Sequence, residues 1–120
     1  MQDGGDGEIV TNEDLMKKLD WAKGNGLIPV VVQDDKSKMV LMLAYVNQEA
    51  LDKTLRTGYA HYWSRSHNKL WMKGETSGHT QKIKRIATDC DYDTLLYVVA
   101  QKGPACHTGE TTCFHKDFEL

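Results

Sequence analysis

Residues 89–101, DCDYDTLLYVVAQ, constrain the fold of this chain more than any other segment. The apolar, β-branched and aromatic residues that fill its second half predict a buried strand. If the first half is extended as well, its side chains alternate between two faces, so that Asp89, Asp91 and Asp93 lie on one face and Cys90 lies on the other. Carboxylate oxygens are hard ligands that suit Mg²⁺ or Ca²⁺, whereas a thiolate is a soft ligand that suits Zn²⁺. The segment therefore predicts two separate metal sites.

Two other interpretations of the three acids are weaker. An EF-hand calcium loop that began at Asp89 would need glycine at its sixth position and glutamate at its twelfth, where this chain has Thr94 and Ala100. A solvated acidic face is the simpler alternative, but three carboxylates that face together without a basic residue repel one another unless a cation is present. In a straight strand Asp89 and Asp93 are about 13 Å apart. Either the strand bends, or only two of the acids bind the cation directly.

The spacing of the cysteines predicts a homodimer. A straight strand over residues 91–101 carries the chain about 30 Å away from Cys90, and residues 102–106 bring it back by at most about 17 Å. A sharp bulge within residues 91–101 would remove this argument. Zinc–sulfur bonds are only about 2.3 Å long. If all three cysteines share one zinc ion, Cys90 must come from one subunit, and Cys106 and Cys113 from the other, which gives two symmetric sites. The alternative is that the three cysteines are unconnected buried thiols.

Three thiolate ligands would leave the fourth position of a tetrahedral zinc ion open for water, as in catalytic zinc sites. Because zinc-bound water has a pKa near 7, zinc-bound hydroxide would serve as a nucleophile at neutral pH. His107, which directly follows Cys106, is the candidate general base or proton shuttle, and His79 is the second candidate. The other histidines are expected to be structural: His61, His67 and His115.

Two polar stretches, WSRS and KGETSGHT, are candidates for binding phosphate groups. They offer hydroxyls, a guanidinium, an ammonium and flexible glycine backbone. Each alone is typical of an ordinary polar turn, and only their combination predicts a substrate-binding surface. The candidate substrate-binding residues are Trp63, Ser64, Arg65, Ser66, Lys73, Gly74, Glu75, Ser77, Gly78 and His79.

Two helices are predicted in the N-terminal half of the chain. Residues 11–26 begin with Thr11 and Asp14 at capping-box spacing and are expected to end at Gly24 or Gly26. Their apolar face would consist of Leu15, Leu19 and Ala22. Asn47 is expected to cap a second helix over residues 48–57, which ends at Gly58 and buries Ala50, Leu51 and Leu55.

The remaining pattern predicts an α+β fold with a mainly antiparallel, twisted sheet. Residues 27–34 and 39–46 are apolar runs that predict a hairpin in the core. Four later stretches alternate as strands of an antiparallel sheet: residues 59–65, 69–73, 81–90 and 94–101. A long loop over 103–115 follows. Residues 1–10 are expected to be a mobile tail, and residues 11–120 a single domain.

Composition excludes several classes of function. The formal net charge of −2 gives no basic surface of the kind that nucleic-acid-binding proteins carry. No apolar run reaches the roughly 20 residues of a membrane span, and the first residues are acidic and glycine-rich, unlike a signal peptide. The expected location is the cytoplasm, where cysteines stay reduced and are free to bind metal.

Several motifs together resemble the phosphoribosyl-AMP cyclohydrolases of histidine biosynthesis: GLIPVVVQD, VLMLAYVNQEAL, YWSRS, LWMKGETSGHTQ, DCDYDTLL and GPACHTGE with Cys113. The resemblance runs from about Leu27 to Phe114. It implies hydrolysis of the N1–C6 bond in the adenine ring of 1-(5-phosphoribosyl)-AMP by an intertwined homodimer that uses Zn²⁺ and Mg²⁺. It also implies that the zinc ligands, shared between subunits, are Cys90, Cys106 and Cys113, and that the magnesium ligands are Asp89, Asp91 and Asp93.

Two other classes of function remain as alternatives. A zinc-dependent nucleobase deaminase also directs hydroxide to a ring carbon, but that class needs the motifs H-x-E and P-C-x-x-C. This chain has CHTGE, and six residues separate Cys106 from Cys113. A non-enzymatic, zinc-stabilised dimer that binds nucleotides is the second alternative, and it predicts four protein ligands on the zinc.

Overall fold

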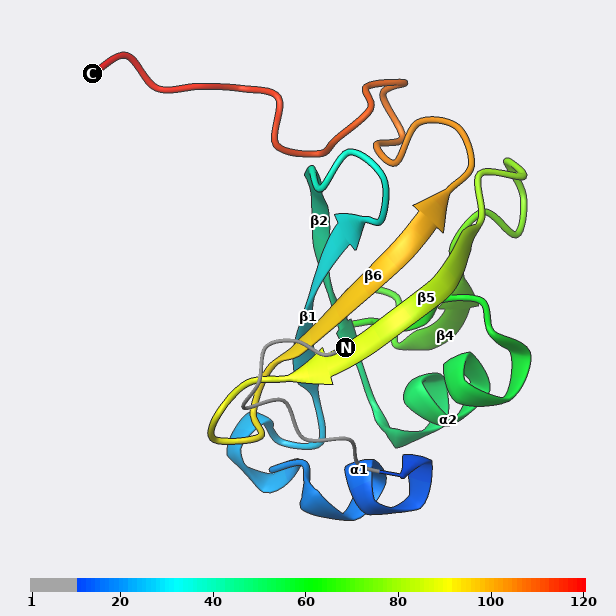
Figure 1. The fold of residues 1–120 in the computed structure, drawn as a ribbon, viewed down its shortest axis with the longest axis vertical. Coiled ribbons are helices and arrows are strands. Elements are labelled where there is room, and N and C mark those ends of the chain that lie inside the picture. The colour runs from blue at the N-terminus through cyan, green and yellow to red at the C-terminus, as the bar shows by residue number, and fades with distance from the viewer. Residues whose placement is uncertain (1–10) are drawn as a thin grey trace.

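Residues 11–120 make up the described part of the structure, a computed structural model, and the expected tail, residues 1–10, lies outside it. The helices and strands are α1 (Asn12–Lys18), the 3₁₀ turn η1 (Ala22–Gly24), β1 (Ile28–Asp34), β2 (Val40–Val46), α2 (Gln48–Thr57), β3 (His61–Ser64), β4 (Lys69–Met72), β5 (Gln81–Thr88) and β6 (Leu95–Gln101). One sheet has the strand order β2-β1-β6-β5 (Figure 1). β3 and β4 form a separate two-stranded sheet.

The main sheet is antiparallel at two of its three strand pairings. β1 and β2 form the predicted hairpin, with Ile28 opposite Val46, and β5 runs antiparallel to β6, with Gln81 opposite Gln101. The pairing of β1 with β6 is parallel. The predicted α+β class and the mainly antiparallel sheet are therefore confirmed.

The prediction that the strands after α2 form one sheet is wrong. β3 and β4 pair with each other, and within the described residues β6 lies between β1 and β5 instead. The reason is the burial of β6, in which Leu95, Tyr97, Val98 and Val99 are all buried. A strand that is apolar on both faces takes a central position, where neighbouring strands satisfy its backbone on both sides.

One face of the main sheet carries the core. Val30 of β1 and Tyr97 of β6 pack in one buried cluster with Leu51 of α2 and Tyr62 of β3. In Figure 1, α2 and β4 lie at the right of the sheet, below β5, and the shared cluster shows that α2 packs on this core. The buried Tyr62 hydroxyl donates a hydrogen bond to Gln81 Oε1 at 2.5 Å, which satisfies both groups inside the core. No helix within residues 11–120 is long and apolar enough to span a membrane.

The two predicted helices differ in how well their ends were predicted. In α2, Asn47 Oδ1 accepts a hydrogen bond from the Ala50 backbone N–H at 2.8 Å, and Gly58 ends the helix with a φ of 79°, so both caps are confirmed. In α1, Thr11 caps the first turn as predicted, but the helix ends at Lys18 instead of Gly24 or Gly26. Ala22 is consequently exposed and not part of the apolar face.

The early end of α1 has a tertiary cause. Leu19 leaves the helix with a ψ of 138° and remains buried. The next residue, Asp20, donates its backbone N–H to the carbonyl oxygen of Tyr92 at 2.8 Å. A contact with a residue some 70 positions later therefore replaces the next helical hydrogen bond.

Residues 89–93 are a turn, not an extended strand, which corrects the prediction. Asp89 Oδ1 accepts hydrogen bonds from the backbone N–H groups of Asp93 (3.1 Å) and Thr94 (3.2 Å). Tyr92 has a φ of 62°, in the left-handed region. β6 consequently begins at Leu95 and not at residue 91. The turn is the bend that three directly binding acids would require.

Candidate active site

The turn brings the three acids of the DCDYD motif together. Among residues 11–120, Asp89, Asp91 and Asp93 are the only group of three or more histidines, cysteines or acids whose ligand atoms all lie within 4.8 Å of one another. The hydrogen bond with Asp93 is the main cause that raises the pKa of Asp91, whereas a hydrogen bond from Lys23 lowers the pKa of Asp93. Such opposite shifts are expected where carboxylates share one site with one cation. Three converging oxygen donors fit Mg²⁺ or Ca²⁺.

Cys106 and Cys113 lie in the loop that follows β6. Cys106 is only 8% exposed, and the Thr108 hydroxyl donates to its Sγ at 3.0 Å. This hydrogen bond, with another from the Thr108 backbone, lowers the pKa of Cys106 to about 6. Burial raises the pKa of Cys113, and the charge of Cys106 adds to this effect. One thiolate therefore forms easily at neutral pH, and the pair offers two soft donors to a metal ion.

The loop carrying this cysteine pair is anchored to the start of β2. The backbone N–H of Cys113 donates to the carbonyl oxygen of Leu41 at 2.7 Å, and the Thr112 hydroxyl donates to that of Val40 at 2.7 Å. His115 lies close to the pair, with its Nε2 at 3.9 Å from Cys106 Sγ. His107, the predicted general base, is exposed beside Cys106.

Cys90 lies at the other end of β6. It is exposed in the acidic turn, at the bottom of Figure 1, while the loop with Cys106 and Cys113 is at the top. The seven residues of β6 span about 20 Å. This is less than the predicted 30 Å, because residues 91–94 turn instead of extending. Strand length alone therefore no longer separates Cys90 from Cys106, because residues 102–106 could return by about 17 Å. Figure 1 shows this loop beyond the far end of β6, and residues 11–120 contain no ligand group in which Cys90 joins Cys106 and Cys113.

The KGETSGHT stretch packs against the loop that carries the cysteine pair. Lys73 Nζ donates to the carbonyl oxygen of Ala105 at 2.6 Å. The backbone N–H of Lys102 donates to the carbonyl oxygen of Thr80 at 3.0 Å. Gly103 permits this contact, since a Cβ there would lie 2.6 Å from the ring of His79. His79, the second predicted base, is therefore held near the cysteine loop.

Other residues predicted to bind substrate shape the 73–80 loop itself. Glu75 Oε1 accepts a hydrogen bond from the Met72 backbone N–H at 2.7 Å. Ser77 Oγ accepts a hydrogen bond from the His79 backbone N–H at 3.2 Å. A Cβ at Gly74 would lie 2.4 Å from the backbone of His79, so only glycine fits there. The structure thus gives these residues a local role in the loop.

The WSRS stretch lies at the opposite end of the β3–β4 hairpin from the 73–80 loop. It lines a cleft of about 420 Å³. The guanidinium of Arg65 stacks on the ring of Tyr45, 3.9 Å from its centroid, and Ser64 Oγ lies 3.2 Å from His67 Nδ1. The lining residues are Met42, Leu43, Ala44, Tyr45, Trp63, Ser64, Arg65, Ser66, His67, Lys69 and Trp71. The two stretches therefore form two clusters and not one cradle.

Sequence reasoning missed several residues at these sites. Lys23 forms an ion pair with Asp93, although 70 positions separate them. Tyr45 contributes to the cleft from β2, and Thr108 binds the Cys106 sulfur. Only Thr108 had a local signal, its position two residues after a candidate ligand. The others depend on chain packing that no short motif encodes.

Together these features define an α+β domain with an acidic cluster at one end of β6 and a cysteine pair at the other. A sequence model described as phosphoribosyl-AMP cyclohydrolase matches residues 42–115. A protein of that name from Archaeoglobus fulgidus is 63% identical over 94 residues, which cover 78% of this chain and 87% of that protein. Another of that name, from Lacticaseibacillus casei, is 57% identical over 103 residues, covering 86% of this chain and 94% of that protein.

The histidine biosynthesis bifunctional protein HisIE of Pyrococcus furiosus is 56% identical over 104 residues. The match covers 87% of this chain and 49% of that longer protein. The chain belongs to the phosphoribosyl-AMP cyclohydrolase family.

Proposed function

We propose that this protein hydrolyses the N1–C6 bond in the adenine ring of 1-(5-phosphoribosyl)-AMP, and so opens the ring, in histidine biosynthesis. The family membership supports the reaction. The observation that carries the proposal is the division of two donor sets between the ends of β6, with Cys90 among the acids at one end and Cys106 and Cys113 at the other.

The working unit in this proposal is a homodimer. Cys90 of one subunit meets Cys106 and Cys113 of the partner subunit at one zinc ion, and the symmetric contact gives a second site. The same contact brings the acidic turn of one subunit next to the cysteine loop of the other. Three sulfur donors, one with a pKa lowered to about 6, fit zinc, while the carboxylate oxygens of Asp89, Asp91 and Asp93 fit magnesium.

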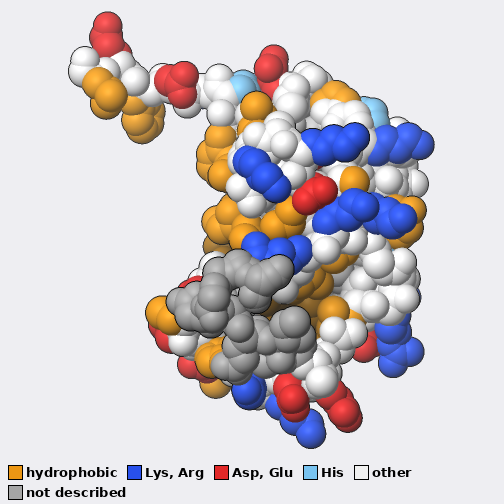
Figure 2. Space-filling model, viewed as in Figure 1, with side chains coloured by type: hydrophobic (Ala, Val, Ile, Leu, Met, Phe, Trp, Pro, Cys, Tyr) orange, Lys and Arg blue, Asp and Glu red, His pale blue; other side chains and the backbone are white. Residues whose placement is uncertain are grey.

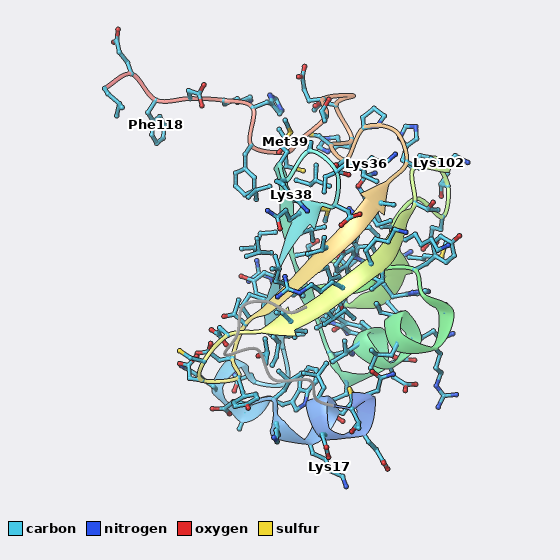
Figure 3. All side chains as sticks on the ribbon, in the orientation of Figure 1. Lys17, Lys36, Lys38, Met39, Lys102 and Phe118 are labelled. Carbon is cyan, nitrogen blue, oxygen red and sulfur yellow. The ribbon has the colours of Figure 1, made fainter. Side chains whose placement is uncertain are left out.

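Exposed apolar side chains on the β2 edge of the sheet support association. Met39, Val40 and Leu43 are 41–49% exposed, and Phe114 beside the cysteine pair is 59% exposed. Figure 2 shows hydrophobic side chains along the left edge of the molecule, and Figure 3 shows Met39 at the top, by the loop that joins β1 and β2. Because apolar side chains that are exposed together at the edge of a sheet tend to pack against another surface, this edge is suited to a dimer contact.

Each cluster has a separate task in the reaction. Bound zinc would supply water of lowered pKa as the nucleophile for the ring carbon C6. His107 accepts a proton from that water, with His79 as the second candidate for this role. Arg65, Ser64 and Ser66 bind one phosphate in the cleft, and the backbone around Gly78 in the 73–80 loop binds the other. Lys73 holds the two loops together through Ala105, and its contribution is positioning.

The direct test is incubation with 1-(5-phosphoribosyl)-AMP while ultraviolet absorbance reports ring opening, with and without a chelator. We expect chelation to stop turnover, and zinc to restore it. Cys106→Ala should abolish turnover and leave substrate affinity largely intact. Normal turnover by zinc-free Cys106→Ala protein would refute the role of the metal.

Subunit mixing tests the shared site. Homodimers of Cys90→Ala and of Cys106→Ala should each be inactive. After random exchange between them, half of the dimers are hybrids with one intact site, so activity should return to about a quarter of the wild-type value. As the control, mixing Cys106→Ala with Cys113→Ala restores nothing, because both losses fall in the same half-site. No recovery in the first mixture would show that the site is not shared in this way.

The position of His115 favours one alternative enough to test it. Its Nε2 lies 3.9 Å from Cys106 Sγ, so it is a potential fourth protein ligand. Four protein ligands would make a closed structural zinc site in a nucleotide-binding dimer. In that case His115→Ala weakens zinc binding and wild-type protein does not open the ring. An open catalytic site instead predicts that His115→Ala retains both zinc and turnover.

A further inference from the structure

Among residues 11–120, Lys23 is the basic residue that forms ion pairs with the acidic cluster. Its Nζ forms an ion pair with Asp93 Oδ2 and lies 3.8 Å from Asp91 Oδ2. No prediction from the sequence placed a basic residue here, because Lys23 belongs to η1, far from the DCDYD motif along the chain.

The backbone that carries Lys23 is fixed to the acidic turn. The backbone N–H of Lys23 donates to Asp20 Oδ1 at 3.1 Å, and that of Asp20 donates to the carbonyl oxygen of Tyr92 at 2.8 Å. The side chain itself remains 59% exposed. The ammonium group is thus delivered to the acids by an ordered segment, while its long side chain is free to swing into solvent.

An ammonium ion and a divalent cation cannot both occupy the space between Asp91 and Asp93. Magnesium binds carboxylate oxygens at 2.0–2.1 Å and calcium at 2.3–2.6 Å, so an ion between these acids would lie against the ammonium group that already contacts one oxygen of each. The side chains of Lys23 and Asp91 are about 60% exposed and that of Asp93 is 20% exposed, so solvent and salt partly screen these contacts and weaken them. A divalent cation can therefore displace Lys23 at a small cost.

We propose that Lys23 is an internal competitor that lowers the affinity of the acidic cluster for divalent cations. Before the cation binds, its single charge holds the mutually repelling carboxylates in place. When the cation binds Asp91 and Asp93, the ammonium leaves. This inference rests on the metal site of the proposed function and adds a residue that tunes it.

The test is a calorimetric titration of the zinc-loaded protein with magnesium chloride at constant ionic strength. Lys23→Met removes the ammonium group that competes for the acids and that repels the magnesium ion. It should therefore tighten magnesium binding about two- to tenfold. Lys23→Arg, which keeps the charge, should remain close to wild type.

The matched control is Lys17→Met. Lys17 extends from α1 into solvent (Figure 3) and forms no ion pair with any residue from 11 to 120, so its loss should change the affinity by less than about twofold.

The outcomes separate this inference from the metal site itself. Equal affinities in wild-type and Lys23→Met protein, with binding lost in Asp91→Asn, would overturn the competition and leave the site intact. Tighter binding in Lys17→Met as well would also overturn it, because the effect would then be one of net charge. Absence of magnesium binding in both wild-type and Lys23→Met protein would overturn the site and the inference together.

Discussion

Gly103→Ala tests whether close packing of two loops positions the candidate active site. Gly103 has a φ of 72°, and the left-handed region costs a residue with a Cβ about 1–2 kcal/mol. The new methyl group would also meet His79 Cδ2 at 2.6 Å and Cγ at 3.0 Å. Forcing a packed side chain aside costs about 1–3 kcal/mol. We expect the substitution to lower the free energy of unfolding by about 2–5 kcal/mol.

Gly58→Ala is the matched control for the backbone contribution. Its φ of 79° is close to that of Gly103, but apart from its chain neighbours no atom of residues 11–120 lies within 4 Å of the position its Cβ would take. It should therefore cost only about 1–2 kcal/mol. Urea unfolding of both variants and wild type, at one protein concentration and with zinc present, gives the two losses under equal conditions.

The double substitution Gly103→Ala with His79→Ala isolates the contact between the loops. Because the shortened side chain leaves room for the new methyl group, adding Gly103→Ala to His79→Ala should cost only the backbone contribution. The reasoning is refuted if Gly103→Ala costs no more than Gly58→Ala, or if removing the His79 ring leaves its cost unchanged.

Two further predictions concern the thiol and the cap of α2. Thr108→Val removes the hydroxyl that lowers the pKa of Cys106 to about 6, so in metal-free protein the thiolate absorbance should appear at higher pH than in wild type; an unchanged midpoint would contradict this. A lowered thiol pKa stabilises the fold at pH values above the ordinary thiol pKa, and this stabilisation is lost as the pH falls through about 6. Thr108→Val protein should therefore lose less stability than wild type as the pH falls through this range. Asn47→Ala removes the side chain that binds the Ala50 N–H and should cost about 1 kcal/mol in urea unfolding, whereas Asn47→Asp, another good cap, should cost less.

Features that depend on neighbouring residues were predictable from the sequence. Asn47 and Gly58 mark the two ends of α2, because a cap bonds within one helical turn. The β1–β2 hairpin follows from two apolar runs with a short polar connection. The same holds for the chemistry of the acids and thiols, since a donor atom keeps its hardness or softness in any fold. Strand length predicted the separation of Cys90 from Cys106, but β6 is shorter than predicted, and the path of the loop after it completes the separation.

Packing between distant segments decided the rest. The turn at residues 89–93 depends on Asp89 binding the backbone beyond it and on Tyr92 binding Asp20, so alternation along an isolated strand did not predict it. The parallel pairing of β1 with β6 joins segments more than 60 residues apart. Lys23 contacts Asp93 for the same reason. A short window of sequence encodes periodicity and caps, but the balance of burial and hydrogen bonding among remote segments is settled only when the whole chain has folded.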